Sequence, residues 1–175
     1  MRNALSISLV LALLVGGTYA VINFQKEQSG ALLFEEYFSP QPLMGYSTQR
    51  SLTAGDISSE TSMLRQGIAY HQQEDYELAL VALRAYLAGQ PENPPPAAHL
   101  LAATAAIMTG QYEEGKALLE DGTPTASEYA IASTWYQALL AIRAQQFQQA
   151  KEALQRLSGT PGSEKYPIND LLRRL

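Results

Sequence analysis

The stretch Asp75-Tyr76-Glu77-Leu78-Ala79-Leu80 decides the fold, because the chain carries it twice more in altered form. The second copy is Gln111-Tyr112-Glu113-Glu114-Gly115-Lys116, and the third is Gln146-Phe147-Gln148-Gln149-Ala150-Lys151. In each copy an aromatic residue precedes Ala or Gly by three positions, and a Leu follows four positions later. The small residues of successive copies are 36 and 35 positions apart. Self-similarity at such a period indicates a stack of similar supersecondary units.

The residues around these copies have a helical pattern. From Glu60 onward the apolar positions recur with the period of an α-helix. Two helices that cross closely need small residues at the crossing, and we expect Gly67 to face Ala79 across such a crossing. Tyr70, Tyr76 and Leu83 would then fill the space around it. The sequence therefore predicts antiparallel helical hairpins.

The first copy resembles a tetratricopeptide repeat, and it does so at Gly67, Tyr70, Asp75-Tyr76, Ala79, Leu83, Pro91 and Asn93. The later copies depart from this pattern, since Ala103 and Ala138 replace the glycine and Gly115 replaces the alanine. The resemblance implies an all-α solenoid of about three helical hairpins over residues 60–175. The leucine-rich segment 167–175 is expected to form a final helix that caps the stack.

The N-terminal segment Ala4–Phe24 carries no charge and lies between Arg2 and Lys26. As a helix it would span roughly 30 Å, the thickness of the hydrocarbon core of a bilayer. It is either an uncleaved transmembrane anchor or a signal peptide cleaved after Ala20. The apolar run continues past that site, which favours the anchor. In both cases the charge at Arg2 predicts that the rest of the chain is exported.

A stripe of small residues recurs at every fourth position of this segment, at Ala4, Ser8, Ala12, Gly16 and Ala20. Such a stripe lets transmembrane helices approach closely. Chance spacing in a segment of this composition is the alternative, and we favour it because such patterns are common.

The segment from Gln25 to Ser59 reads as a linker, with an apolar cluster inside it at Leu32, Leu33, Phe34, Tyr37 and Phe38. Exposed aromatic clusters are uncommon, so we expect this cluster to pack on its own domain. It would either brace the solenoid near the first repeat or fill the repeat groove as an autoinhibitory segment. We favour bracing near the first repeat, because the shorter path costs less loop-closure entropy.

A wider resemblance covers most of the chain. The order of segments is a membrane segment, Leu32-Leu33-Phe34-Glu35-Glu36-Tyr37-Phe38-Ser39-Pro40, Arg50, repeats that contain Trp135-Tyr136-Gln137-Ala138-Leu139, and a leucine-rich end. This order is similar to that of membrane-anchored tetratricopeptide proteins of Gram-negative bacteria. The resemblance implies a single-pass protein of the cell membrane whose periplasmic repeat domain acts as an adaptor or scaffold.

The composition argues against several other functions. The net charge of −5 lacks the basic footprint of a nucleic-acid-binding protein. There is no cysteine, and the two histidines, His71 and His99, are too far apart in sequence to suggest a metal site. No catalytic motif is present. The sequence therefore predicts no enzyme, no cofactor and no small-molecule substrate.

Protein binding is the function that the pattern favours. In a helical solenoid the first helix of each hairpin lines the inner face. In the register of the copies that face would present Leu64, Ile68, His71, Leu100, Thr104, Ile107, Trp135, Leu139 and Arg143. A mostly apolar face favours an apolar or amphipathic peptide or helix as partner. Trp135 is the best anchor candidate, and a core position between repeats is its alternative. The alternative function is an obligate structural subunit of a membrane complex.

Overall fold

The computed structural model describes residues 29–40, 59–89, 94–122 and 128–175, and every regular element in these ranges is a helix. The predicted all-helical fold is therefore confirmed for them. The membrane segment, with Ala4, Ser8, Ala12, Gly16 and Ala20, lies outside the described residues, so the choice between anchor and signal peptide stays a prediction. Within the four described ranges, no helix combines the length and apolarity needed to cross a bilayer.

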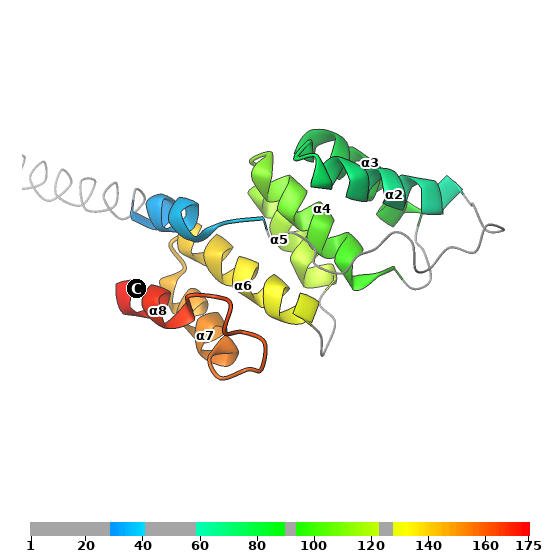
Figure 1. Cartoon of the computed structure of the whole chain (residues 1–175). Coiled ribbons are helices and arrows are strands. Elements are labelled where there is room, and N and C mark those ends of the chain that lie inside the picture. The colour runs from blue at the N-terminus through cyan, green and yellow to red at the C-terminus, as the bar shows by residue number, and fades with distance from the viewer. Residues whose placement is uncertain (1–28, 41–58, 90–93, 123–127) are drawn as a thin grey trace, which may run out of the picture.

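Six of the helices pair into three consecutive hairpins. The hairpins consist of α2 (Ser59–Gln72) with α3 (Tyr76–Ala88), α4 (Pro96–Met108) with α5 (Tyr112–Asp121), and α6 (Glu128–Arg143) with α7 (Phe147–Leu157). The short α8 (Ile168–Arg174) follows them, and a helix over residues 29–37 precedes them. Figure 1 shows the hairpins stacked in chain order, with α8 next to α7 and the 29–37 helix at the end of α6.

The turns within the three hairpins share one geometry, which explains the sequence repeat. Each turn has one residue with left-handed φ, namely Glu74 at 61°, Gly110 at 79° and Gln145 at 60°. This residue stands two positions before the aromatic residue of each copy. The N–H of the next residue then donates to the carbonyl five positions back, over 2.7–3.0 Å in the three turns. The turns therefore repeat at the spacing predicted for the copies.

The first hairpin has a close helix crossing at Gly67. A Cβ added there would lie 2.5 Å from Cγ of Leu83, so the crossing depends on the missing side chain. The three atoms nearest to such a Cβ belong to Leu83, so the pairing of Gly67 with Ala79 stays a prediction. Ala79 packs in a cluster with Ala105 and Ala106 of the next hairpin.

Helix α4 lies at the centre of the stack and packs against α2, α3, α5 and α6. A helix surrounded in this way must be apolar on all sides, and small side chains let the neighbouring backbones approach. Its alanines are at most 1% exposed, at Ala97, Ala98, Ala102, Ala103, Ala105 and Ala106. The crossing of α4 with α5 is close at Gly115, whose added Cβ would meet Ile107 Cγ1 at 2.7 Å.

Helix α8 caps the last hairpin, as the sequence predicted for residues 167–175. It buries Ile168 and Leu171 in the cluster that holds α6 and α7. Arg173 and Arg174 remain exposed on its other side. The helix therefore gives the C-terminal end of the stack a polar surface, as terminal units of a solenoid require.

Candidate protein-binding surfaces

The nine residues predicted for the inner face do come from the first helix of each hairpin, but most of them lie in the interior. Those exposed by 9% or less are Ile68, His71, Leu100, Thr104, Ile107, Trp135 and Leu139. Only Leu64 and Arg143 of the nine are partly exposed. The close approach of these helices places most of the nine between neighbouring hairpins. They do not form an open face here, and their role in binding stays a prediction.

His71 connects the first two hairpins. Its Nε2 lies 2.9 Å from Oγ1 of Thr104, whose hydroxyl is also 3.0 Å from the carbonyls of Leu100 and Leu101. Burial lowers the pKa of His71 to about 4, so its ring is neutral at pH 7. The neutral ring and the Thr104 hydroxyl share one hydrogen bond, and the hydroxyl also lies within hydrogen-bond distance of a backbone carbonyl. The pair is a satisfied core contact.

Trp135 is a core residue, which was the alternative that the sequence left open. Its side chain is 2% exposed, and its ring stacks on Tyr166 with centroids 5.1 Å apart. Tyr166 belongs to the segment between α7 and α8. The end of the chain therefore covers the position where a partner would have contacted Trp135.

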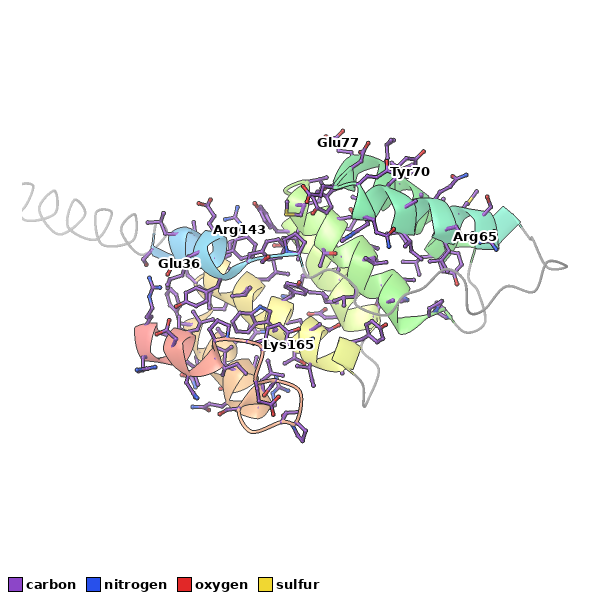
Figure 2. All side chains as sticks on the ribbon, viewed as in Figure 1. Glu36, Arg65, Tyr70, Glu77, Arg143 and Lys165 are labelled. Carbon is purple, nitrogen blue, oxygen red and sulfur yellow. The ribbon has the colours of Figure 1, made fainter. Side chains whose placement is uncertain are left out.

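Arg143, at the end of α6, lies between two aromatic rings. Its guanidinium carbon is 3.7 Å from the ring centroid of Tyr112 and 5.7 Å from that of Phe34. Such stacking on aromatic faces is favourable for arginine, because the cation meets the negative face of the ring. Arg143 thus joins α5, α6 and the 29–37 helix, and Figure 2 labels it beside that helix.

The apolar cluster of the linker forms the 29–37 helix and docks on the last hairpin. Leu33 and Phe34 are 9% and 5% exposed. The Phe34 ring meets Tyr112 edge-on at 5.7 Å and stacks on Phe38 at 5.0 Å, and Phe38 lies 5.4 Å from Tyr136 of α6. The apolar side of the helix is therefore covered by aromatic residues of α5 and α6.

A close backbone approach and polar contacts hold this helix at the two ends of its described residues. A Cβ added to Gly30 would lie 2.6 Å from the carbonyl oxygen of Ile142, so the helix touches the backbone of α6. Past the other end, the Tyr136 hydroxyl donates to the Ser39 carbonyl over 2.9 Å. Toward α8, Arg174 pairs with Glu36 (Figure 2), and the Tyr37 hydroxyl donates to Asp170.

These contacts also shift the titration of two side chains. The hydrogen bond from Arg174 lowers the pKa of Glu36, because it favours the charged carboxylate. The hydrogen bond to Asp170 raises the pKa of Tyr37, because it favours the protonated phenol. Both groups therefore hold the charge state that the contact with α8 needs at neutral pH.

The docking position corrects the prediction that the cluster braces the first repeat. The segment packs on the last hairpin and α8, at the far end of the stack. Doubling a loop costs only about 0.6 kcal/mol of closure entropy, so the shorter path is a weak preference. Aromatic contacts with Tyr112 and Tyr136 contribute more than that. The sequence shows the apolar face of the segment, but not which distant surface is aromatic.

A cavity of about 670 Å³ opens beside the docked helix. It is lined by α5 with Glu113, Lys116 and Glu120, by α6, and by the α6–α7 turn with the start of α7. Ala31 of the 29–37 helix closes one end. Glutamine amides from the turn and from α7 provide donors and acceptors that suit a peptide backbone. Sequence reasoning missed this cavity, although the glutamine-rich third copy was a signal for it.

The first hairpin exposes apolar side chains on the outer side of α3. Leu78 and Val81 are 45% and 61% exposed, and they are three positions apart on one face of the helix. Glu77 marks the same end of α3 in Figure 2. Neighbouring exposed aliphatic residues are a feature of contact surfaces.

The structure offers little for metal chemistry. Among the described residues, no three side chains of the His, Asp or Glu type are grouped so that they could hold a metal ion. His99 packs over Gly122, and burial lowers its pKa. Both histidines therefore occupy packing positions.

The comparisons with known proteins concern the central part of the chain. Neither the comparison with curated proteins nor that with solved structures gave a match. The family model that matches covers the stretch from the last turn of α2 into α6, which includes the second hairpin complete. Residues 70–133 match the tetratricopeptide repeat family, and this match, with the stacked hairpins, supports a tetratricopeptide repeat protein.

Proposed function

We propose that this protein is a membrane-tethered adaptor that binds another protein through its helical repeats. The observation that carries the proposal is the tetratricopeptide match at residues 70–133, because such repeats generally mediate protein–protein interaction. The apolar side chains on α3 and the cavity beside α6 supply surfaces for a peptide or helix. The proposal includes no catalytic step, no cofactor and no nucleic acid.

Membrane tethering is part of the same proposal. The charge-free run of residues 4–24 behind Arg2 supports a single-pass anchor with the repeats on the periplasmic side. Mass spectrometry of the protein extracted from membranes tests it. An N-terminus at residue 1 or 2 agrees with an anchor, whereas a mature N-terminus at Val21 means a signal peptide.

Site-specific photo-crosslinking of the full-length protein in membranes tests the adaptor role. A photoreactive residue at Gln149 lies in the lining of the cavity. One at Gln148 lies at an exposed position of the same helix that does not line the cavity. We expect the Gln149 variant to form one dominant crosslinked band that excess unmodified protein competes away. Equal labelling by both variants, or none by either, would contradict the proposal. A band of fixed stoichiometry that resists competition would favour an obligate subunit.

A further inference from the structure

The 29–37 helix contacts the repeats as a bound ligand helix does. Its buried side carries Gly30, Leu33 and Phe34, whereas Leu32 on the opposite side is 63% exposed. It touches α5, α6 and α8, which are separated from it by more than 70 positions of sequence. Residues 41–58 join it to α2, so the contact is intramolecular but made at long range.

The surface under this helix, which we call the aromatic seat, consists of Tyr112, Tyr136, Arg143, Asp170 and Arg174. Two aromatic rings receive Phe34 and Phe38. Arg174 receives a carboxylate at Glu36 and also donates to the Tyr37 hydroxyl at 3.1 Å. The seat therefore selects an amphipathic helix with aromatic residues four positions apart and an acidic residue between them.

The seat holds the helix through buried apolar contacts of Leu33 and Phe34 and through an exposed polar rim. The Glu36–Arg174 pair is exposed, with side-chain exposures of 54% and 41%, and such pairs contribute little. Trp135 is covered by Tyr166 and does not depend on the helix. The hairpins can therefore stay packed when the helix leaves.

We propose that the aromatic seat is a docking surface for an amphipathic helix of a partner protein, and that the chain's own 29–37 helix occupies it until that partner replaces it. The partner helix carries two aromatic residues four positions apart and a carboxylate that faces Arg174. This proposal rests on the protein-binding role proposed above and names the partner class. Because the internal helix is tethered, it competes for the seat at millimolar effective concentration. The partner helix must therefore bind the seat tightly enough to displace a competitor at that concentration.

A fluorescent peptide of residues 29–40 is the probe, titrated against full-length protein in detergent. Leu33→Ala removes a buried contact of the internal helix, and Leu32→Ala is the matched control on its exposed side. We expect the peptide to bind Leu33→Ala at least tenfold more tightly than wild type, and Leu32→Ala like wild type. A peptide that lacks both Phe34 and Phe38 should not bind any variant.

A locked variant makes the assay independent of any loss of stability. The chain has no cysteine, so Glu36→Cys with Arg174→Cys can be joined by a bifunctional maleimide without side reactions at native thiols. The locked protein should bind the peptide at least tenfold more weakly than the same double variant before joining, which lacks Arg174 as well. Glu36→Lys, which changes only the exposed rim, should strengthen binding by about threefold through loss of the attraction to Arg174.

Three results would overturn the proposal. One is absence of peptide binding to Leu33→Ala and Glu36→Lys while circular dichroism shows folded repeats, which makes the helix a permanent brace. Another is equal binding of the peptide to the locked protein and to the same double variant before joining. The third is exchange of 29–37 helices between copies, seen as a dimer in sedimentation, which assigns the seat to a second copy. If one of these results is found and Gln149 still crosslinks specifically, the adaptor role remains supported. If the crosslinking at Gln149 also fails, both proposals are contradicted.

Discussion

The first and last hairpins are built on the same repeat, yet they differ in what covers them. The last hairpin is enclosed by α8, by Tyr166 on Trp135 and by the 29–37 helix. The first hairpin leaves Leu78 and Val81 exposed on its outer side. Both ends of the described chain thus meet at one end of the stack.

From this difference we expect position in the stack, rather than repeat sequence, to set local stability. In a solenoid each unit gains stability from its neighbours. The third hairpin has α5 on one side and three further segments around it, whereas the first contacts mainly α4. We expect the first hairpin to open locally before the last.

Truncating the aromatic core of the last hairpin should give the largest effect. Trp135→Ala leaves a cavity under Tyr166 and is expected to cost about 3–5 kcal/mol of unfolding free energy. Tyr70→Ala in the first hairpin removes a partly exposed ring and should cost about half as much. Urea unfolding measures both, and an equal loss would remove the distinction between the hairpins.

Acid should weaken the contact between the first two hairpins. The pKa of folded His71 is about 4, below the unfolded value of about 6.5, so the unfolded state binds more protons between these pH values. Stability is complete above about pH 6.5 and falls as the pH drops toward 4, by up to roughly 3 kcal/mol. His71→Gln should remove most of this slope in urea unfolding measured at several pH values. If the dependence of stability on pH is unchanged in His71→Gln, a group other than His71 causes it.

The close crossing in the first hairpin gives an intermediate effect. Gly67→Ala places a methyl group against Leu83 and should cost about 1–3 kcal/mol, because the side chain and helices must shift. Gln148→Leu at an exposed position of α7 is the control and should be nearly neutral. Melting temperatures that are equal for the two variants would contradict the crossing.

The smallest effect concerns the turns, where first and last hairpins should behave alike. Glu74 and Gln145 hold left-handed φ values that favour glycine. Glu74→Gly and Gln145→Gly should each raise stability by up to about 1 kcal/mol, whereas Gly110→Ala should lower it by a similar amount. Thermal unfolding checks these signs, and destabilisation by both glycine substitutions would show that the turn geometry is misassigned.

The repeats were predictable from the sequence because they are local patterns. The aromatic residue, the small residue three positions later and the turn spacing all lie within one hairpin, and the structure has three such hairpins and a final helix. The close contact of Gly67 with the Leu83 side chain depends on side-chain packing that the spacing does not encode.

The long-range contacts were not predictable in the same way. An apolar face at Leu33 and Phe34 shows that the segment packs, but not where it packs. The aromatic seat combines residues from three helices, and the cavity beside it combines α5, α6 and α7. Likewise, the spacing of the repeats placed Trp135 correctly on the first helix of its hairpin, α6. It did not show that Tyr166 covers Trp135, because Tyr166 lies in a segment outside the repeated pattern.

Hydrogen–deuterium exchange of the full-length protein, compared between wild type and Leu33→Ala, tests whether the 29–37 helix docks on the last hairpin. We expect amides 29–37 to be protected in wild type and to lose protection in the variant, together with the end of α6 and α8 around Ile142 and Arg174. Helices α2 and α3 should exchange as before. Unprotected amides at 29–37 in wild type, or a change confined to the first hairpin, would contradict docking on the last hairpin.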